Sequence, residues 1–245
     1  MKNKVVSMKV VWISAGVSSF IAGYLVRNTV DKWIYIDVKD QHPDSIRFIK
    51  DCEKLIDTEI EILRSDRFED VVRKTHMINS PHGAACTGML KKAVRKAWEN
   101  ARYEEGISDL VYVWGMDAKE KRRAESIKQN FPEFGHEFPL IDRWLSKEDC
   151  HALADELGLK RPIMYDMGYS NNNCVGCLKG GMGYWNKIRA DFPDVFASRA
   201  ALEREIGHSC INGVYLDELD PNAGRMSREI MEDCSIMCYL AKNEM

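Results

Sequence analysis

An uncharged run of 17 residues, from Val10 to Val26, lies almost at the start of the chain and constrains the fold more than any other feature. The basic opening MKNK and the length of the run are typical of a signal peptide or a membrane anchor. Lys9 nevertheless interrupts the apolar start, and no A-x-A-like cleavage site follows. The centre of the run is rich in small residues: Ser14, Ala15, Gly16, Ser18 and Ser19. The pattern therefore favours a buried strand at 9–13, a loop at 14–19 and a helix beyond it.

The composition predicts a soluble protein with one large domain, or one domain and a small appendage. The 245 residues are 45% hydrophobic and 30% charged, and the net charge is -3. This slight acidity argues against binding nucleic acid by charge alone, although basic clusters remain available at residues 91–96 and 121–123. Eight cysteines without a convincing export signal indicate a reducing compartment. We therefore expect a cytoplasmic protein whose thiols serve metals or chemistry.

Short β-type runs alternate with longer helical stretches over the first two thirds of the chain. We expect strands at 9–13, 33–38, 59–63 and 110–115, with a weaker fifth at 138–141, and helices at 18–27, 44–56, 87–103, 119–129 and 146–157. This alternation is typical of an α/β, doubly wound fold, in which a mostly parallel sheet carries helices on both faces and binds ligands at the carboxyl ends of its strands. It predicts an α/β domain over residues 1–161. Residues 162–245, rich in Gly, Asn, Cys and aromatic residues at their start, are interpreted as a Cys-containing C-terminal extension that packs on the same domain.

The loop SAGVSS, between the first expected strand and the first expected helix, has the composition of an anion site. Its backbone N–H groups, its hydroxyls and the helix N-terminus that follows suit a phosphate or a sulfate. A turn that only lets the helix pack closely on the sheet would have the same composition. From these residues alone, both interpretations stay open.

Several segments, in order, resemble motifs of the adenine-nucleotide α-hydrolase superfamily, or PP-loop group. SAGVSS is similar to its loop SGGKDS, with Val17 and Ser18 where Lys and Asp stand. The sulfonucleotide reductases, or phosphoadenosine phosphosulfate reductase family, also lack that Lys and Asp. IYIDVKDQHPDSIRFIK resembles their D-T-G strand end and following helix, and CTGMLKK resembles C-x-x-x-L-K.

Four further segments extend the resemblance over residues 8–238. GMDAKEKRRA is similar to G-x-R-x-x-E-x-x-x-R, with Asp117 in place of the first Arg. FPLIDRW, followed by YDMGYSNNNCVGC, resembles P-L-x-x-W and L-Y-x-x-G-Y-x-x-x-x-C-x-x-C. EDCSI resembles the tail motif E-C-G-I/L-H, with Met237 in place of the His.

The resemblance implies a Rossmann-like adenine-nucleotide α-hydrolase fold with a nucleotide over the strand ends. The loop would hold the phosphosulfate, Arg122 or Arg123 would supply countercharge, and Asp37 would contact a ribose hydroxyl. Asp37 as a helix cap and Lys91 as a solvated lysine remain alternatives. The nucleotide-binding residues expected in this way are Ser14, Ala15, Gly16, Val17, Ser18, Ser19, Asp37, Lys91, Gly115, Glu120, Arg122 and Arg123.

The cysteines point to a metal centre and to a nucleophile. Cys174 and Cys177 form C-x-x-C, Cys234 and Cys238 form C-x-x-x-C, and two such pairs suit zinc or an iron–sulfur cluster. In cluster-containing relatives, adjacent cysteines at the Cys86 segment join the later C-x-x-C, but Ala85 stands at one of these positions. We therefore expect zinc or a [4Fe–4S] cluster at Cys86, Cys174, Cys177 and Cys238. A small inert or redox-active pair is the alternative for the C-x-x-C.

The remaining cysteines, aromatics and histidines are interpreted as structural. Buried cysteine is common, so Cys52, Cys150 and Cys210 are assigned to packing. Trp144, Tyr184 and Trp185 are expected to pack in the core or in a lid. The expected structural histidines are His42, His76, His82 and His136.

The sequence leads to three hypotheses for function. By resemblance, the first is a sulfonucleotide reductase, in which the thiolate of Cys234 attacks the sulfur of an adenosine phosphosulfate and a thioredoxin-like protein then releases sulfite. The second is an ATP-dependent enzyme that thiolates or otherwise modifies a nucleobase. The third is a non-catalytic regulator that binds an adenine nucleotide. No membrane partner is expected, and the oligomeric state is left open, a homo-oligomer included.

Overall fold

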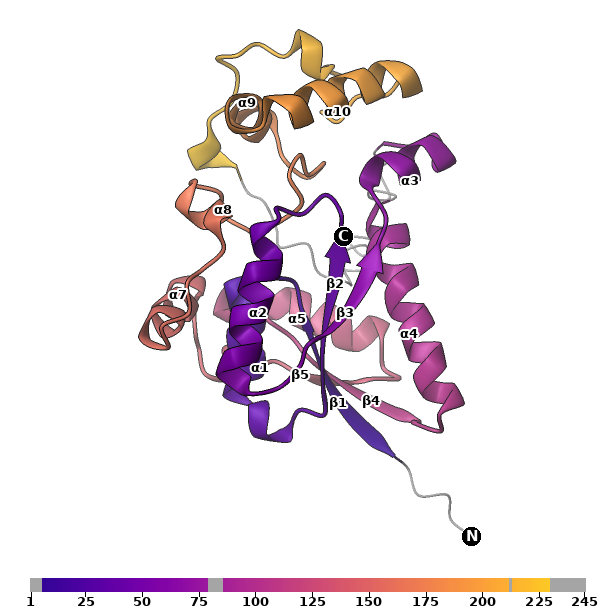
Figure 1. The fold of residues 1–245 in the computed structure, drawn as a ribbon, viewed down its shortest axis with the longest axis vertical. Helices are drawn as coiled ribbons and strands as arrows, with labels where there is room; N and C mark the ends of the chain where they lie inside the picture. Colours follow the sequence, from indigo (N-terminus) through magenta and orange to yellow (C-terminus); the bar gives the residue numbers. More distant parts are fainter. Residues whose placement is uncertain (1–5, 79–85, 212, 230–245) are drawn as a thin grey trace.

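The computed structural model describes residues 6–78, 86–211 and 213–229. At its centre lies a five-stranded sheet in the order β3-β2-β1-β4-β5, and all four strand pairs are parallel (Figure 1). The strand order reverses at β1, which lies between β2 and β4, so a topological switch point falls at the ends of β1 and β4. The strands are β1 (Ser7–Ile13), β2 (Lys32–Val38), β3 (Glu61–Ser65), β4 (Asp109–Val113) and β5 (Gly135–Glu137).

Helices cover both faces of this sheet, which confirms the α/β class. One face packs on α1 (Val17–Leu25), α2 (Asp44–Ile56) and α7 (Lys147–Glu156). The other face packs on α4 (Ala93–Glu104) and α5 (Lys121–Asn130). The other helical segments are η1 (Arg27–Thr29), α3 (Phe68–Thr75), η2 (Thr87–Lys92), η3 (Ala118–Glu120), α6 (Pro139–Asp142), α8 (Ile163–Asp166), α9 (Met182–Asp191), α10 (Pro193–Ile206), η4 (Leu216–Glu218) and η5 (Met226–Arg228).

The opening run folds as a strand, a loop and a helix, as the small residues at its centre predict. Val10–Ile13 are buried in the central strand β1, because helices cover both faces of a parallel sheet. The chain then turns at Ser14–Gly16 and enters α1 at Val17. Over residues 6–78, 86–211 and 213–229, no helix is both long enough and apolar enough to cross a bilayer.

The expected fifth strand at 138–141 is wrong, because residues Pro139–Asp142 form the short helix α6 and β5 ends before them at Glu137. Proline suits the first turn of a helix, where its missing N–H has no partner to lose, whereas inside a sheet it would remove a ladder hydrogen bond. The third strand lies two residues later than expected. The helix expected at 87–103 begins as the π-helical segment η2 and continues as α4.

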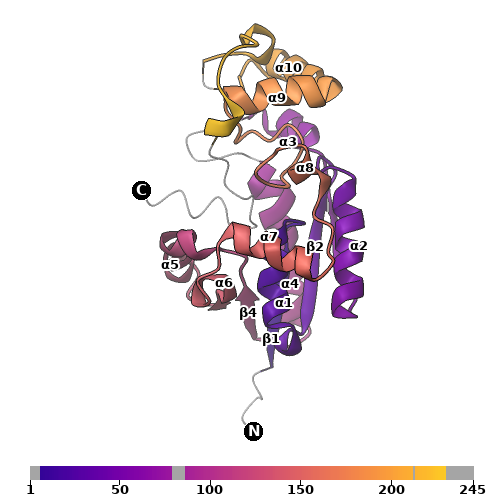
Figure 2. The same cartoon turned by 90° about the vertical axis from the view of Figure 1, so that its left-hand side faces the viewer.

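The segment after Pro162 lies beyond the carboxyl ends of the strands, where α9 and α10 form a layer of their own (Figures 1 and 2). Arg199 of α10 joins this layer to the sheet. Its side chain is 3% exposed, and its guanidinium donates to Asp40, which follows β2, at 2.7 Å and to Glu69 of α3 at 2.6 Å. Burial opposes the charge of Glu69, but the hydroxyl of Ser198 and the charge of Arg199 hold the pKa of Glu69 below its usual value.

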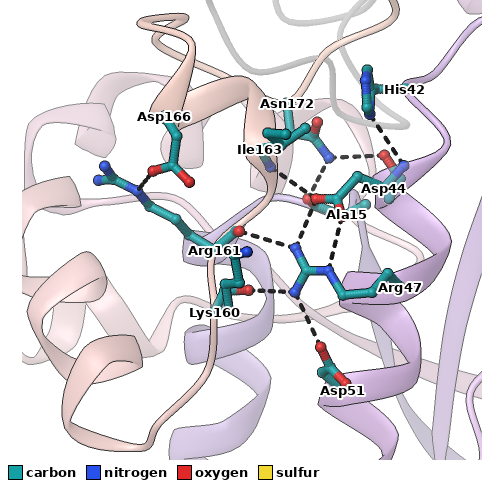
Figure 3. A network of polar contacts seen from close by, with 11 residues as sticks. Ala15, His42, Asp44, Arg47, Asp51, Lys160, Arg161, Ile163, Asp166 and Asn172 are labelled. Atoms are coloured by element: carbon teal, nitrogen blue, oxygen red, sulfur yellow. Dashed lines mark hydrogen bonds and ion pairs between the residues drawn. The ribbon is translucent and has the colours of Figure 1, made fainter.

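Arg47 of α2 fixes the chain where it passes from α7 to α8 (Figure 3). Its guanidinium donates to the carboxylates of Asp44, at 2.7 and 2.9 Å, and of Asp51, at 3.1 Å. It also donates to the backbone carbonyls of Lys160 and Arg161, at 2.7 and 3.0 Å. The hydrogen bond from Arg47 is the main reason that the pKa of Asp44 is lowered. One side chain therefore holds both its own helix and a segment more than a hundred residues away.

Candidate functional site

The loop after β1 is held in shape by hydroxyl groups of its own sequence. The Ser19 hydroxyl accepts a hydrogen bond from the backbone N–H of Ser14 at 3.0 Å and donates to the carbonyl of Gly16 at 2.8 Å. The Ser14 hydroxyl donates to the same oxygen of Ser19 at 3.1 Å. Ala15 has a φ of 58°, a left-handed conformation that costs free energy for a residue with a Cβ. The Ser19 hydroxyl thus stabilises a tight turn directly before the N-terminus of α1.

Side chains from outside the loop bind its carbonyl groups. Asn172 donates its amide to the carbonyl of Ala15 at 2.8 Å and to the hydroxyl of Ser45 at 3.0 Å, and Figure 3 shows this contact beside α2. Gln41 donates to the carbonyl of Ser14 at 3.4 Å. With these carbonyl groups engaged, the first-turn amides of α1 remain the polar groups that the loop offers to a ligand, because a helix cannot satisfy them itself.

Gly115 brings the end of β4 into contact with this helix N-terminus. A Cβ at Gly115 would lie 2.4 Å from the Cα of Ser19 and 2.7 Å from its backbone N. A Cβ at Gly16 would also be tight, at 3.2 Å from the Ser14 hydroxyl and 3.3 Å from that of Tyr165. Gly115 therefore allows the chain after β4 to approach the first turn of α1 at the switch point, and Gly16 leaves room for the two hydroxyls beside the loop.

An open pocket of about 710 Å³, here called the loop pocket, lies at this switch point. The loop contributes to its lining, as do the cations Lys91, from η2, and Arg123, from α5. Arg123 forms an ion pair with Glu120 at 2.6 Å, and Glu120 also accepts the backbone N–H of Asp117 at 3.1 Å. The lining residues are Trp12, Ile13, Ser14, Gly16, Ser18, Ser19, Ile36, Lys91, Trp114, Gly115, Met116, Glu120 and Arg123.

Eight of the twelve residues expected to bind a nucleotide line this pocket, and four do not. Ala15 and Val17 belong to the loop and the first turn of α1, but their side chains are buried away from it. Asp37 lies one residue beyond the lining residue Ile36, and because side chains alternate along a strand it points to the other face of the sheet. Arg122 is exposed, and its neighbour Arg123 lines the pocket.

The apolar wall of the loop pocket was not expected from the sequence. Trp12 shares a sheet face with Val10, and Trp114 shares one with Tyr112, so strand alternation is the signal that could have found both. The indole N–H of Trp114 donates to His136 at 3.1 Å, which makes this half-buried histidine a structural one. The indole N–H of Trp12 is buried and has no hydrogen-bond partner among the described residues.

A second open pocket, of about 420 Å³ and here called the thiol pocket, brings together the three expected metal ligands that the structure describes. Cys86 precedes η2, and Cys174 and Cys177 flank a turn at Gly176, whose φ is 73°. The Tyr184 hydroxyl holds this turn, since it accepts the N–H of Cys177 at 2.9 Å and donates to the carbonyl of Cys174 at 3.3 Å. The thiol pocket is also lined by Val38, Phe68, Thr87, Leu90, Lys91, Leu178 and Arg199.

The metal centre itself remains a prediction. Cys238, its expected fourth ligand, and Cys234, the expected nucleophile, lie outside the described residues. Among the residues that the structure does describe, no group of three or more Cys, His, Asp or Glu side chains is arranged to hold a metal ion. The thiols of Cys86, Cys174 and Cys177 share one pocket, but by themselves they do not complete a site for zinc or for an iron–sulfur cluster.

Most of the cysteines and aromatic residues interpreted as structural are buried, but Trp144 is exposed. Cys52, Cys150 and Cys210 are buried, as expected, and burial raises the pKa of each thiol, that of Cys150 to about 12. Tyr184 and Trp185 are buried in the core. Trp144 contradicts its expectation, because its side chain is 71% exposed.

Comparison of the sequence with protein-family models and with curated proteins finds no match.

Proposed function

We propose that the loop pocket binds an adenosine phosphosulfate and that the protein is a thiol-dependent sulfonucleotide reductase with the adenine-nucleotide α-hydrolase fold. The observation that carries this proposal is the composition of the loop pocket. At the switch point, a small-residue loop and the N-terminus of α1 share one pocket with Lys91, Arg123 and several apolar side chains. Helix amides and two cations suit the charged phosphosulfate, and the apolar walls suit a nucleoside.

The loop itself supports a phosphosulfate over a triphosphate. Val17 and Ser18 stand where ATP-using relatives of the resembled family would have Lys and Asp, so the loop contributes no cation of its own. The positive charge of the pocket comes from Lys91 and Arg123, which belong to η2 and α5. Lys91 lines the thiol pocket as well, which makes the two pockets neighbours and favours chemistry between a bound nucleotide and a thiol.

The proposed reaction has two steps. The thiolate of Cys234 attacks the sulfur of the phosphosulfate, an S–S bond forms, the S–O bond to phosphate breaks, and its electron pair leaves on the adenosine phosphate. One thiolate of a thioredoxin-like dithiol then attacks the Sγ of Cys234, a mixed disulfide forms, and the S–S bond to the sulfonate breaks with release of sulfite. Its second thiol resolves the mixed disulfide, so the dithiol is oxidised and Cys234 is regenerated. Lys91 and Arg123 would offset the charge of the departing phosphate.

Intact mass spectrometry tests the first step without a reductant. The wild-type protein, incubated with adenosine 5′-phosphosulfate or its 3′-phosphorylated form, should gain the mass of one SO₃ group. Cys234→Ser should keep its nucleotide affinity and lose the adduct, because a hydroxyl is a far weaker nucleophile near neutral pH. Cys150→Ala is the matched control, since Cys150 is buried in packing and its substitution should leave the adduct unchanged.

Three outcomes would contradict the proposal. An adduct that persists in Cys234→Ser would place the nucleophile elsewhere. Release of pyrophosphate from ATP, without an adduct, would favour the ATP-dependent modification of a nucleobase. Binding of nucleotides without any turnover would favour a regulator.

A further inference from the structure

Trp144 is the most exposed large hydrophobic side chain of the described residues, at 71%, and it lies in an unfavourable backbone conformation. Its φ is 55°, in the left-handed region that is rare for a bulky residue. The next most exposed are Val6, Met77 and Tyr103, at 44% to 48%. Burial of the indole therefore offsets little of the strain that its backbone stores.

The strain arises because Trp144 occupies the position after a helix end where glycine is usual. Its backbone N–H donates to the carbonyl of Ile141 at 3.1 Å, and the N–H of Leu145 donates to that of Leu140 at 2.9 Å. These two bonds form a Schellman motif at the end of α6, whose left-handed residue is here Trp144. A glycine would stabilise the same turn, so an exposed tryptophan at this place calls for another role.

The backbone around the indole is fixed on both sides. The carbonyl of Leu145 accepts the N–H of Ala118 at 2.9 Å, which ties the turn to η3. Ser146 and Asp149 form a capping box that begins α7 directly afterwards. Because η3 ends at Glu120, which lines the loop pocket, this tie connects the turn that carries Trp144 to a segment of the pocket wall.

A cation already lies on the ring. The ammonium of Lys121 is 3.5 Å from the ring centroid of Trp144, a close cation–π contact. At 71% exposure the indole cannot be covered on both faces, so one face remains open to a planar group. Within residues 118–122 and 142–149, the exposed cations are Lys119, Lys121, Arg122 and Arg143, and the exposed acids are Asp142, Glu148 and Asp149.

We propose that Trp144 and Lys121 form a platform that binds single-stranded nucleic acid, with an unpaired base stacked on the indole and a phosphate beside the cations. A rigid, exposed aromatic ring suits stacking, because each base has a planar face and the ring loses little freedom on binding. The small excess of local positive charge means that stacking supplies more of the affinity than phosphate contacts do. The platform does not depend on sulfonucleotide chemistry, so either proposal can fail alone.

Fluorescence anisotropy with a labelled 12-nucleotide single-stranded RNA tests the platform. Trp144→Ala should weaken binding about 5- to 100-fold, and Trp144→Phe should keep most of it, as stacking predicts. Lys121→Ala should weaken binding less and lower the salt slope by about one. Tyr103→Ala, which removes an exposed aromatic from the end of α4, is the matched control and should bind as wild type does.

Trp144→Gly separates a binding role from a structural one. It should raise the melting temperature by about 2–4 °C, because glycine suits the left-handed position, and yet lose binding as Trp144→Ala does. The proposal is overturned if wild type does not bind the RNA, if Trp144→Ala binds it unchanged, or if duplex RNA binds equally well. An equal loss of affinity for adenosine 5′-phosphosulfate in Trp144→Ala would also overturn it, since the ring would then belong to the loop pocket.

Discussion

Gly115→Ala places one methyl group at the contact on which the loop pocket depends. The new Cβ would lie 2.4 Å from the Cα of Ser19, whereas two carbon atoms are comfortable at about 3.5 Å. Both sides of this contact are backbone, so no flexible side chain can move aside. The end of β4 and the N-terminus of α1 must therefore separate by about 1 Å.

This separation has two consequences of different size. Overpacking of a tight contact costs about 1–3 kcal/mol, which for a chain of this length lowers the melting temperature by about 2–12 °C. A shift of about 1 Å also moves the first-turn amides of α1 away from the place where an anion would contact them. We expect affinity for adenosine 5′-phosphosulfate to fall at least tenfold, or about 1.4 kcal/mol.

Thermal unfolding and isothermal titration calorimetry measure the two effects on the same samples. Gly88→Ala is the matched control, because a Cβ at Gly88 meets nothing within 4 Å and its φ is not positive. That variant should keep its affinity and its stability, or gain slightly in stability, since alanine favours a helix. A Gly115→Ala protein with unchanged stability would refute the close contact. A destabilised protein with unchanged affinity would refute the loop pocket as the nucleotide site.

Two further predictions concern the joint with the C-terminal layer and the thiol pocket. Arg199→Met should lower the free energy of unfolding by about 3–5 kcal/mol, because it leaves two carboxylates without their buried cation, whereas Arg204→Met, on the exposed side of α10, should change little. The pKa of Glu69 is lowered in the folded protein by the Ser198 hydroxyl and by Arg199, so the stability that comes from the Arg199–Glu69 pair is present above about pH 4.3 and is lost as the pH falls through the lowered value. Denaturant unfolding at several pH values should therefore show a smaller difference between wild type and Arg199→Met in acid. Cys174→Ser should lose iron or zinc from anaerobically purified protein, while Cys150→Ala should retain it, by elemental analysis. Equal metal content in both variants would exclude Cys174 as a ligand.

The sheet and its first loop were predictable because their signals are local. Four apolar residues, Val10–Ile13, favour burial on both faces of a sheet, and the small residues after them favour a turn over a longer strand or a membrane span. The same pattern misplaced the fifth strand, because the apolar run at 138–141 looks alike in a strand and in a short helix. Pro139 favours the helix, because a proline is well placed in the first turn of a helix and here it begins α6.

The residues of the candidate site were predictable where the residue type itself indicates anion binding. They were less predictable on strands, where the register decides which side chain faces the pocket. The loop serines and Arg123 come to one pocket, whereas Asp37 matches the resembled motif and yet Ile36 faces the cavity. A single step along a strand reverses the direction of a side chain, and only the register shows which step is correct. Trp144 was misjudged for another reason: its exposure follows from a turn at the end of α6 that its own residue type disfavours.

The bond between Asn172 and Ala15 has a consequence for how the protein acquires its site during synthesis. It joins residues 157 positions apart, whereas Ser14 and Ser19, within the loop, are 5 apart. In an unfolded chain, closing the longer span costs about 3 kcal/mol more in chain entropy, since the cost grows as (3/2)RT ln n. The loop can therefore take its local shape as soon as β1 and α1 have formed, but its carbonyl is bound only when the last third of the chain has docked. A chain made from its N-terminus would fold its sheet first and complete its binding site last.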